Sequence, residues 1–175
     1  KKLIAGTSKN FGKYLSKELS KNYQIISTSK NLNVKKKNSY ICDFTSADNT
    51  KNFLLGIKNK YPDLNCIIYT IGDSKNYKTS NFKEKIYKKF ETNFLTFYYL
   101  LEFYCEVFKF KPIKFIIFSS IVTEKTILDA PIEYASFKSA LNTYAKYKAK
   151  QLASKNISIN IISPGNILLN GNNWA

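Results

Sequence analysis

The feature that most constrains the fold is a regular alternation of short apolar runs with longer amphipathic segments. The apolar runs predict strands over Leu3–Ala5, Tyr23–Ser27, Ser39–Cys42, Leu64–Thr70, Ile113–Ser119 and Ile157–Ile162. The segments between them predict helices over Asn10–Lys21, from Thr45 or Ser46 to about Lys60, along a long segment ending near Phe108, and over Tyr134–Ser154. Strands that are apolar throughout must be covered on both faces. The alternation therefore predicts an α/β fold, a doubly wound parallel sheet with helices on both sides.

The length and composition fit one domain. The chain has 175 residues, of which 44% are hydrophobic and 15% aromatic, so it can bury a sizeable core. We find no repeat or linker and expect a single domain over residues 1–175. No apolar run approaches the ~20 residues of a membrane span, and no charged-then-apolar leader opens the chain. We therefore expect a cytoplasmic protein with no membrane partner.

The formal net charge of +16 would attract phosphate whatever the fold. All 28 basic residues are lysines, which lack the bidentate geometry of arginine, and they are scattered along the chain. We attribute the charge to a biased composition and expect no nucleic acid as a partner, with a salt-sensitive duplex binder as the alternative.

The chain has no histidine, which removes Ser-His-Asp catalysis, Cys-His catalysis and every histidine metal site. Its three cysteines, Cys42, Cys66 and Cys105, lie in apolar segments without metal-type spacing. We expect reduced thiols in the core and no bound metal.

A glycine-containing turn follows the first predicted strand and opens the first helix. The backbone amides of such a turn, together with the helix N-terminus, can hold a pyrophosphate. Asn10 stands inside the turn, and asparagine is the residue type that best tolerates a left-handed backbone after glycine. An ordinary surface turn is the alternative. The residues expected at the phosphates are Gly6, Ser8, Lys9, Asn10, Phe11 and Gly12.

Tyr134 and Lys138 stand four residues apart at the start of the last predicted helix. On one helix face, the ammonium can favour the ionised phenol and lower the tyrosine pKa from its usual ~10. The sequence holds one other such pair, Tyr144 with Lys148, and chance alone gives roughly two in this composition. Only Tyr134 has a serine, Ser120, at the end of a strand 14 residues upstream. Tyr134 is therefore the candidate acid/base.

These motifs, in this order, resemble those of the short-chain dehydrogenase/reductase family in its single-domain form. The family's Gly-x-x-x-Gly-x-Gly turn is matched from Gly6 to Gly12, with Asn10 in place of the middle glycine. The other matching positions are Asp43, Thr70 and Gly72 at the family's Asn-Ala-Gly, Asn93, and Pro164 with Gly165 after the last strand. Taken singly, Asp43 could be a helix cap and Asn93 a surface asparagine. Their joint order covers essentially the whole chain.

The resemblance implies a Rossmann-like fold and hydride transfer between a nicotinamide cofactor and a carbonyl or alcohol. It implies that Tyr134 exchanges a proton with the substrate oxygen and that Lys138 stabilises the tyrosinate and holds the nicotinamide ribose. It also implies that Ser120, with Ser119 as the alternative, holds the substrate oxygen, and that Asn93 positions a water. The implied cofactor-binding residues are Gly6, Ser8, Lys9, Asn10, Phe11, Gly12, Ser29, Lys30, Asp43, Phe44, Thr70, Gly72, Tyr134, Lys138, Pro164 and Gly165.

The end of the second predicted strand bears on the choice of cofactor. Folds that select NAD usually carry Asp or Glu there, which holds the adenosine ribose and repels a 2′-phosphate. This strand runs into Ser29 and Lys30 without an acid, and Lys9 lies in the glycine turn. Two lysines and the nearby hydroxyls can hold a phosphate dianion, so we expect NADP(H) to be preferred over NAD(H). The alternative is that both lysines merely reflect the composition.

Three further expectations follow from the resemblance. Family members are usually near ~250 residues, so we expect the C-terminal lid and last strand to be absent from this sequence. The helix that holds Asn93 carries more aromatic surface than one sheet face needs, which predicts a homodimer or homotetramer. The departures from the glycine motifs favour a rival function, a non-catalytic dinucleotide-binding sensor or scaffold of the same fold.

Overall fold

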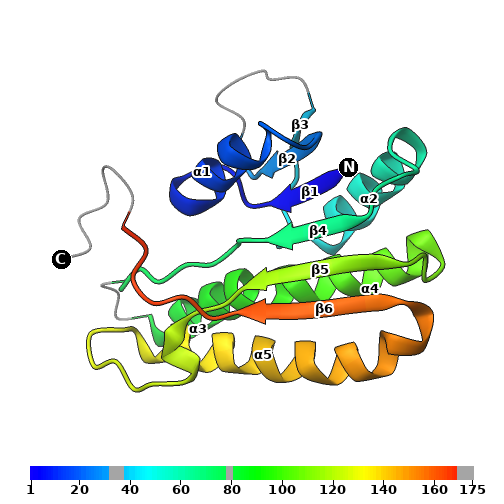
Figure 1. Ribbon diagram of the computed structural model, residues 1–175. Helices are drawn as coiled ribbons and strands as arrows, with labels where there is room; N and C mark the ends of the chain where they lie inside the picture. Colours follow the sequence, from blue (N-terminus) through cyan, green and yellow to red (C-terminus); the bar gives the residue numbers. More distant parts are fainter. Residues whose placement is uncertain (32–37, 78–80, 169–175) are drawn as a thin grey trace.

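One parallel sheet organises the residues that this computed structural model describes, which are 1–31, 38–77 and 81–168. Within them the sheet has six strands in the order β3-β2-β1-β4-β5-β6 (Figure 1). The strands are β1 Lys2–Ala5, β2 Ile25–Ser29, β3 Ser39–Ile41, β4 Cys66–Tyr69, β5 Ile113–Phe118 and β6 Ile157–Ile162. Every neighbouring pair is parallel, and the strand order reverses between β1 and β4. The predicted α/β fold with a parallel, Rossmann-like sheet is confirmed.

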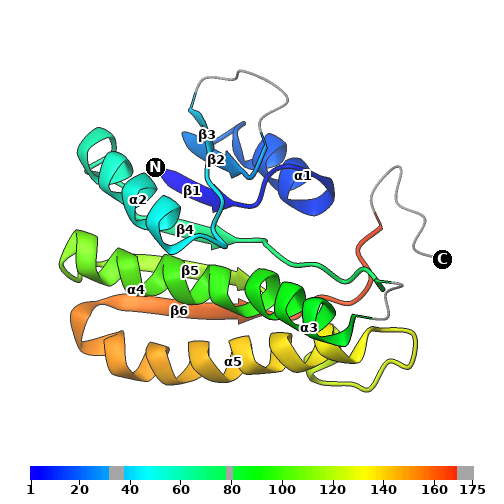
Figure 2. The ribbon, with the colours of Figure 1, turned by 180° about the vertical axis from the view of Figure 1, so that it is seen from behind.

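Helices cover both faces of the sheet. Helix α1 lies on one face, and α2, α4 and α5 lie on the other, as the front and rear views show (Figures 1 and 2). The helices are α1 Asn10–Leu19, α2 Ala47–Lys60, α3 Phe82–Phe90, α4 Thr96–Phe108 and α5 Ile132–Leu152. None of the described helices is both long and apolar enough to span a membrane.

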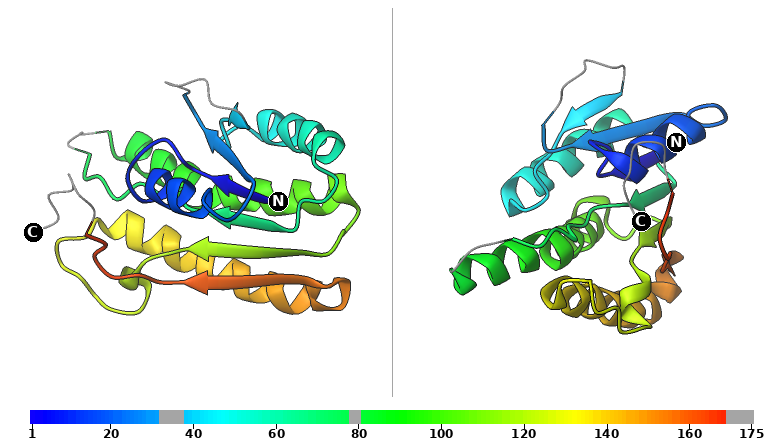
Figure 3. Two further views of the ribbon diagram at one scale, coloured as in Figure 1. Left: turned by 45° about the horizontal axis from the view of Figure 1, so that its top comes forward. Right: turned by 90° about the vertical axis from the view of Figure 1, so that its left-hand side faces the viewer.

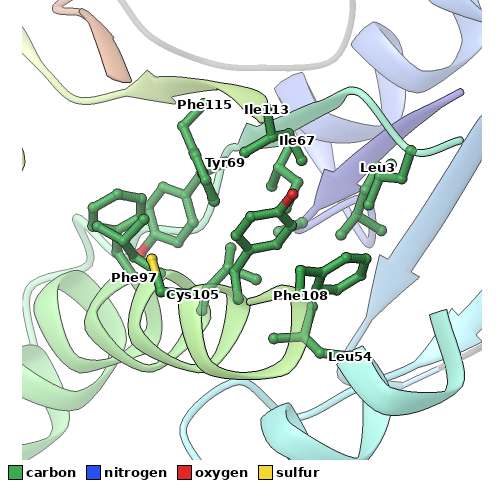
Figure 4. Packing of buried hydrophobic residues seen from close by; sticks show 14 of the residues in the cluster. Leu3, Leu54, Ile67, Tyr69, Phe97, Cys105, Phe108, Ile113 and Phe115 are labelled. Atoms are coloured by element: carbon green, nitrogen blue, oxygen red, sulfur yellow. The ribbon is translucent and has the colours of Figure 1, made fainter. Parts of the chain in front are cut away.

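The larger hydrophobic core fills the space between the sheet and the helices α2, α4 and α5 (Figure 4). Leu54, Phe97 and Phe115 are fully buried there. The ring of Tyr69 on β4 packs edge-on against Phe97, with ring centroids 5.2 Å apart. Its hydroxyl shares a 2.6 Å hydrogen bond with the hydroxyl of Thr96, so the one polar atom of this ring is satisfied inside the core. The three cysteines are free and buried, as the sequence predicts.

The long helix predicted before Phe108 is interrupted by a π-helical turn. Residues Glu91–Leu95 form this turn between α3 and α4, and Asn93 at its centre is completely buried. A π-turn contains one extra residue per turn, so it shifts side chains off the regular helix face, and such turns are frequent at functional sites. The apolar pattern runs through this segment without a break, so the sequence predicts one continuous helix.

The carboxyl ends of the strands lie at one edge of the sheet, on the left in Figure 1. The N-termini of α1 and α5 and the segments that follow β4 and β6 reach the same edge, as the two further views also show (Figure 3). In open parallel sheets, ligands bind outside this edge, at the point where the strand order reverses.

Candidate active site

Tyr134 lies in the first turn of α5, within hydrogen-bond reach of Ser120, which stands two residues after the end of β5. Burial raises the pKa of Tyr134, a hydrogen bond with the Ser120 side chain offsets part of this rise, and the charge of Asp73 adds to it. The alternative serine, Ser119, is buried, and its hydroxyl has no hydrogen-bond partner within the described ranges. The geometry thus brings Ser120, rather than Ser119, to the tyrosine.

Lys138 lies one helical turn after Tyr134 and is almost completely buried. Its Nζ donates to the main-chain oxygen of Ile71 at 3.0 Å and lies 6.0 Å from the centroid of the Tyr134 ring. Burial lowers the pKa of Lys138 to about 8. The expected lowering of the tyrosine pKa by this ammonium is therefore wrong for this structure. The ammonium is directed at a carbonyl, and desolvation of the phenol dominates.

Asn93 reaches the same region from the π-turn and is not the surface asparagine of the alternative interpretation. Its Oδ1 accepts a hydrogen bond from the Asp73 main-chain N–H at 2.9 Å, and its Nδ2 donates to the Asp73 carbonyl at 3.2 Å. A Cβ atom on Gly72 would lie 3.0 Å from the Nζ of Lys138 and 3.5 Å from the Oδ1 of Asn93. The segment after β4 thus holds Lys138 and Asn93 together, and a larger residue at position 72 would press on the end of the Lys138 side chain.

The turn after β1 has the left-handed backbone that the sequence predicts. Gly6 has φ of 98°, and Asn10, at the middle-glycine position, has φ of 47°. Helix α1 begins at Asn10, and the capping position before it, Lys9, makes no side-chain capping hydrogen bond. Ser8 and Lys9 are exposed. The first amides of α1 are therefore placed as an anion site requires.

Thr70 fastens this turn to β4, at the position where the sequence departs from Asn-Ala-Gly. Its hydroxyl lies 2.9 Å from the carbonyl oxygens of both Ala5 and Gly6. The turn is also tightly closed on itself, because a Cβ atom on Gly12 would lie only 2.0 Å from the carbonyl oxygen of Gly6. Glycine at position 12 is thus a requirement of packing.

Lys30 and Asp43 meet beyond the ends of β2 and β3. Their Nζ and Oδ2 atoms are 2.7 Å apart, and the Thr45 hydroxyl donates to Oδ1 of Asp43 at 2.6 Å. Burial opposes ionisation of Asp43, but the bonds from Lys30 and Thr45 hold its pKa below the ordinary value. The cap of α2 is Ser46, so the helix-cap interpretation of Asp43 is wrong. A cavity of about 500 Å³ opens here, lined by Lys30, Asn31, Ile41, Cys42, Asp43, Asn49, Asn52 and Phe53.

The side chains of Phe44 and Ser29, two residues expected at the cofactor, contact other parts of the protein. Phe44 is 4% exposed and packs its ring against Phe53 in the core. Its side chain cannot face a ligand, and only its main chain can. The hydroxyl of Ser29 donates to the carbonyl of Asn31 at 2.9 Å, so a ligand would have to displace that bond.

The remaining expected residues lie near the site edge. The ring of Phe11 packs against Phe118 at the end of β5, with ring centroids 4.6 Å apart. The carbonyl of Pro164 accepts a hydrogen bond from the Ile121 N–H at 2.9 Å, which ties the segment after β6 to the turn that starts at Ser120. A Cβ atom on Gly165 would meet nothing within 4 Å.

Sequence reasoning missed a second link between β5 and α5. Nδ2 of Asn142 donates to the hydroxyl of Thr123 at 3.0 Å, and that hydroxyl donates to the carbonyl of Ser120 at 2.9 Å. Asn142 follows Lys138 by four residues, as Lys138 follows Tyr134, so the helical spacing could have found it. Asp73 and Lys89 were also missed, and no sequence pattern distinguishes Lys89 from the other lysines.

Comparison with known proteins gives one family match. The family profile described as Enoyl-(Acyl carrier protein) reductase matches residues 13–171. No curated protein matches the sequence significantly.

Solved structures share the fold. A short-chain dehydrogenase from Leptospira borgpetersenii serovar Hardjo-bovis with bound NAD+ has a TM-score of 0.86 at 24% identity, over 97% of this chain and 72% of that one. ElxO with NADP bound has a TM-score of 0.80 at 24% identity, over 94% of this chain and 72% of that one. The ligand-free aldohexose dehydrogenase of Thermoplasma acidophilum has a TM-score of 0.81 at 19% identity, over 94% of this chain and 66% of that one. The chain thus spans about two thirds to three quarters of their length.

Proposed function

Because the chain belongs to the short-chain dehydrogenase/reductase family, whose members are oxidoreductase enzymes, we propose that it transfers hydride between NADP(H) and a carbonyl or alcohol substrate. We propose Tyr134 as the acid/base, with Asn93, Ser120 and Lys138 as its partners. Residues 1–175 would act as one dinucleotide-binding and catalytic domain.

The proposed chemistry assigns one task to each side chain. The nicotinamide, when bound, supplies a hydride to the carbonyl carbon or accepts one from the alcohol. Tyr134 donates its phenolic proton to the carbonyl oxygen, so that C=O becomes CH–OH, and takes a proton back in the reverse direction. The Ser120 hydroxyl holds the same oxygen. Burial raises the pKa of the phenol further above neutral pH, so the phenol carries the proton that the reduction requires. The Lys138 ammonium, which donates to the Ile71 carbonyl, would hold the nicotinamide ribose.

The residues present fit a dinucleotide. The left-handed turn of Gly6 and Asn10 and the N-terminus of α1 suit a pyrophosphate. The cavity at Lys30 and Asp43 lies beyond β2 and β3 and suits the adenosine end. Gly72 lies against Lys138, the residue proposed to hold the nicotinamide ribose.

The observation that carries the proposal is the meeting of Tyr134, the Ser120 side chain and Lys138 at the carboxyl edge of the sheet. The test is a panel of aldehydes, ketones and sugars, with NADPH consumption followed by absorbance. We expect substrate-dependent oxidation of NADPH by at least one member. The non-catalytic alternative predicts NADPH binding, seen by cofactor fluorescence, without oxidation by any carbonyl in the panel.

We expect NADPH to bind at least tenfold more tightly than NADH, which corresponds to roughly 1.4 kcal/mol. Lys9 is exposed beside the turn, and Lys30 stands at the cavity, where a 2′-phosphate would compete with Asp43 for its ammonium. Lys9→Ala and Lys30→Ala should therefore each reduce the NADPH/NADH affinity ratio. Titration of both cofactors by fluorescence or calorimetry measures this ratio.

Lys155→Ala is the matched control, because it removes a lysine at the amino end of β6, away from the cavity. It should leave the affinity ratio unchanged. An equal effect of all three substitutions would mean that general positive charge sets the preference. Equal affinities for the two cofactors, or tighter binding of NADH, would contradict the cofactor assignment and leave the family unaffected.

We also expect a homodimer or homotetramer, formed through the exposed faces of α4 and α5. Tyr98 on α4 is 38% exposed and Tyr147 on α5 is 69% exposed. Exposed apolar surface of this kind marks sites of protein–protein contact. Light scattering at micromolar concentration should give at least twice the 20.2 kDa of this chain. Tyr147→Lys should shift the mass toward one chain, whereas Tyr14→Lys on α1 should not. A monomer mass for the unaltered chain would refute the assembly.

A further inference from the structure

Lys89 on α3 is a buried lysine without a part in the proposed chemistry, and its side chain is 0% exposed. Burying an unpaired ammonium is strongly unfavourable, so its partners matter. Its Nζ donates to the main-chain oxygen of Asp73 at 2.7 Å and lies 3.5 Å from the Oδ2 of the same residue. The ring of Tyr77 covers the ammonium, with its centroid 4.8 Å from Nζ.

Asp73 is held from several directions. Its Oδ1 accepts the Lys75 main-chain N–H at 3.0 Å, and the Tyr77 hydroxyl donates to Oδ2. Burial opposes ionisation, but these bonds and the charge of Lys89 keep the pKa of Asp73 below its ordinary value. Asp73 is therefore a carboxylate at neutral pH, paired with the buried ammonium.

The same residue anchors the candidate active site. Both main-chain groups of Asp73 bond to the side chain of Asn93, and the residues just before it contact Lys138 through the Ile71 carbonyl and Gly72. The segment 71–73 is thus the common support of Asn93 and Lys138. The ion pair of Asp73 with Lys89 fixes this segment to α3.

The charge of Asp73 also acts on the phenol of Tyr134. The negative charge of Asp73 raises the pKa of Tyr134. The titratable and charged groups that act on the pair are Lys85 from α3, Glu133 and Tyr134 from α5, and Tyr77 from the chain after β4. A buried ion pair is seldom more stabilising than apolar residues of the same volume, so stability alone does not account for this pair.

We propose that Asp73 and Lys89 are positioning residues of the catalytic centre, a buried ion pair that holds segment 71–73 against Asn93 and Lys138 and sets the charge beside Tyr134. The assignment of that centre rests on the proposed function. The ion pair is independent of that assignment, because it follows from the 2.7 Å and 3.5 Å distances between Lys89 and Asp73.

The test follows the ionisation of Tyr134 in full-length protein labelled with 13C at the tyrosine ring carbon that bears oxygen. The Tyr134 resonance is the one that disappears in Tyr134→Phe. Asp73→Asn removes a negative charge and leaves Lys89, so it should favour the phenolate and move the titration down by about half a pH unit or more. Lys89→Met should move the titration much less, because burial lowers the pKa of Lys89 and raises that of Tyr134, so Lys89 has largely lost its charge where the phenol titrates. The double variant should therefore titrate close to Asp73→Asn.

Asp63→Asn is the matched control, because it removes the carboxylate of another lysine pair at the opposite end of β4, and it should leave the titration unchanged. If Lys89→Met does not fold, the Tyr134 titrations of Asp73→Asn and of the double variant still test the proposal. An unchanged or upward titration in Asp73→Asn overturns the proposal. The readout needs no turnover, so failure of the substrate panel and failure of this inference are separate results.

Discussion

Replacing Tyr134 with phenylalanine is expected to lower kcat/KM by about 10²- to 10⁴-fold, the usual contribution of a positioned proton donor. The substitution removes the hydroxyl that bonds with Ser120 and keeps the ring, so the shape of the site is preserved. NADPH affinity should change by less than about twofold, because the lost atom serves the proton transfer. Steady-state kinetics with the carbonyl found in the panel, and a fluorescence titration of NADPH, measure the two effects.

Tyr144→Phe is the matched control from the other tyrosine–lysine pair. The Tyr144 hydroxyl donates to Glu102, and its ring packs edge-on against Phe94 and Phe97, so this tyrosine serves the α4–α5 interface. Its loss should cost about 1 kcal/mol of unfolding free energy and leave kcat/KM within about twofold. Equal losses of activity in the two variants would show that the wrong pair has been chosen.

Gly12→Ala is expected to destabilise the protein by about 3 kcal/mol or more and to weaken NADPH binding by about tenfold or more. The added Cβ would lie 2.0 Å from the Gly6 carbonyl oxygen and 2.7 Å from the Thr70 hydroxyl, and the first of these is backbone. The turn must open to admit it, which breaks the contact between Thr70 and the turn. Denaturant unfolding and cofactor titration measure the two losses.

Gly56→Ala provides the contrast, because a Cβ there meets nothing within 4 Å and the residue lies inside α2. It should raise the unfolding free energy by about 0.5–1 kcal/mol, the helix preference for alanine over glycine. NADPH affinity should not change. A Gly12→Ala protein as stable as the unaltered chain would mean that the turn is looser than the structure describes.

The sheet could be predicted because its cause is local. Apolar runs of strand length, separated by helix-length segments, can be buried in few ways, and the right-handed crossover rule reduces these further. The strand order β3-β2-β1-β4-β5-β6 itself comes from the structure. The choice of Tyr134 over Tyr144 was also available from the sequence, since only Tyr134 has a serine at the end of the preceding strand. Its catalytic role remains a prediction.

Other features depend on residues that are distant in the chain. The sequence predicts that Lys138 lowers the pKa of Tyr134, but the fold directs its ammonium at Ile71, 67 residues away, and burial raises the tyrosine pKa instead. Lys30 looks like a free cation in the sequence, yet β3 brings Asp43 within 2.7 Å of it. Phe44 looks available to a ligand and is part of the core.

Local sequence was enough to predict the parallel α/β fold, the left-handed turn at Asn10 and the order of the motifs, because hydrophobic period, turn propensity and spacing act over a few neighbouring residues. Tertiary packing sets three other features, which are the π-turn that holds Asn93, the raised pKa of Tyr134 and the burial of Lys89 against Asp73. Those outcomes depend on desolvation and on charges brought together from separate elements. Both are properties of the packed chain that no local pattern contains.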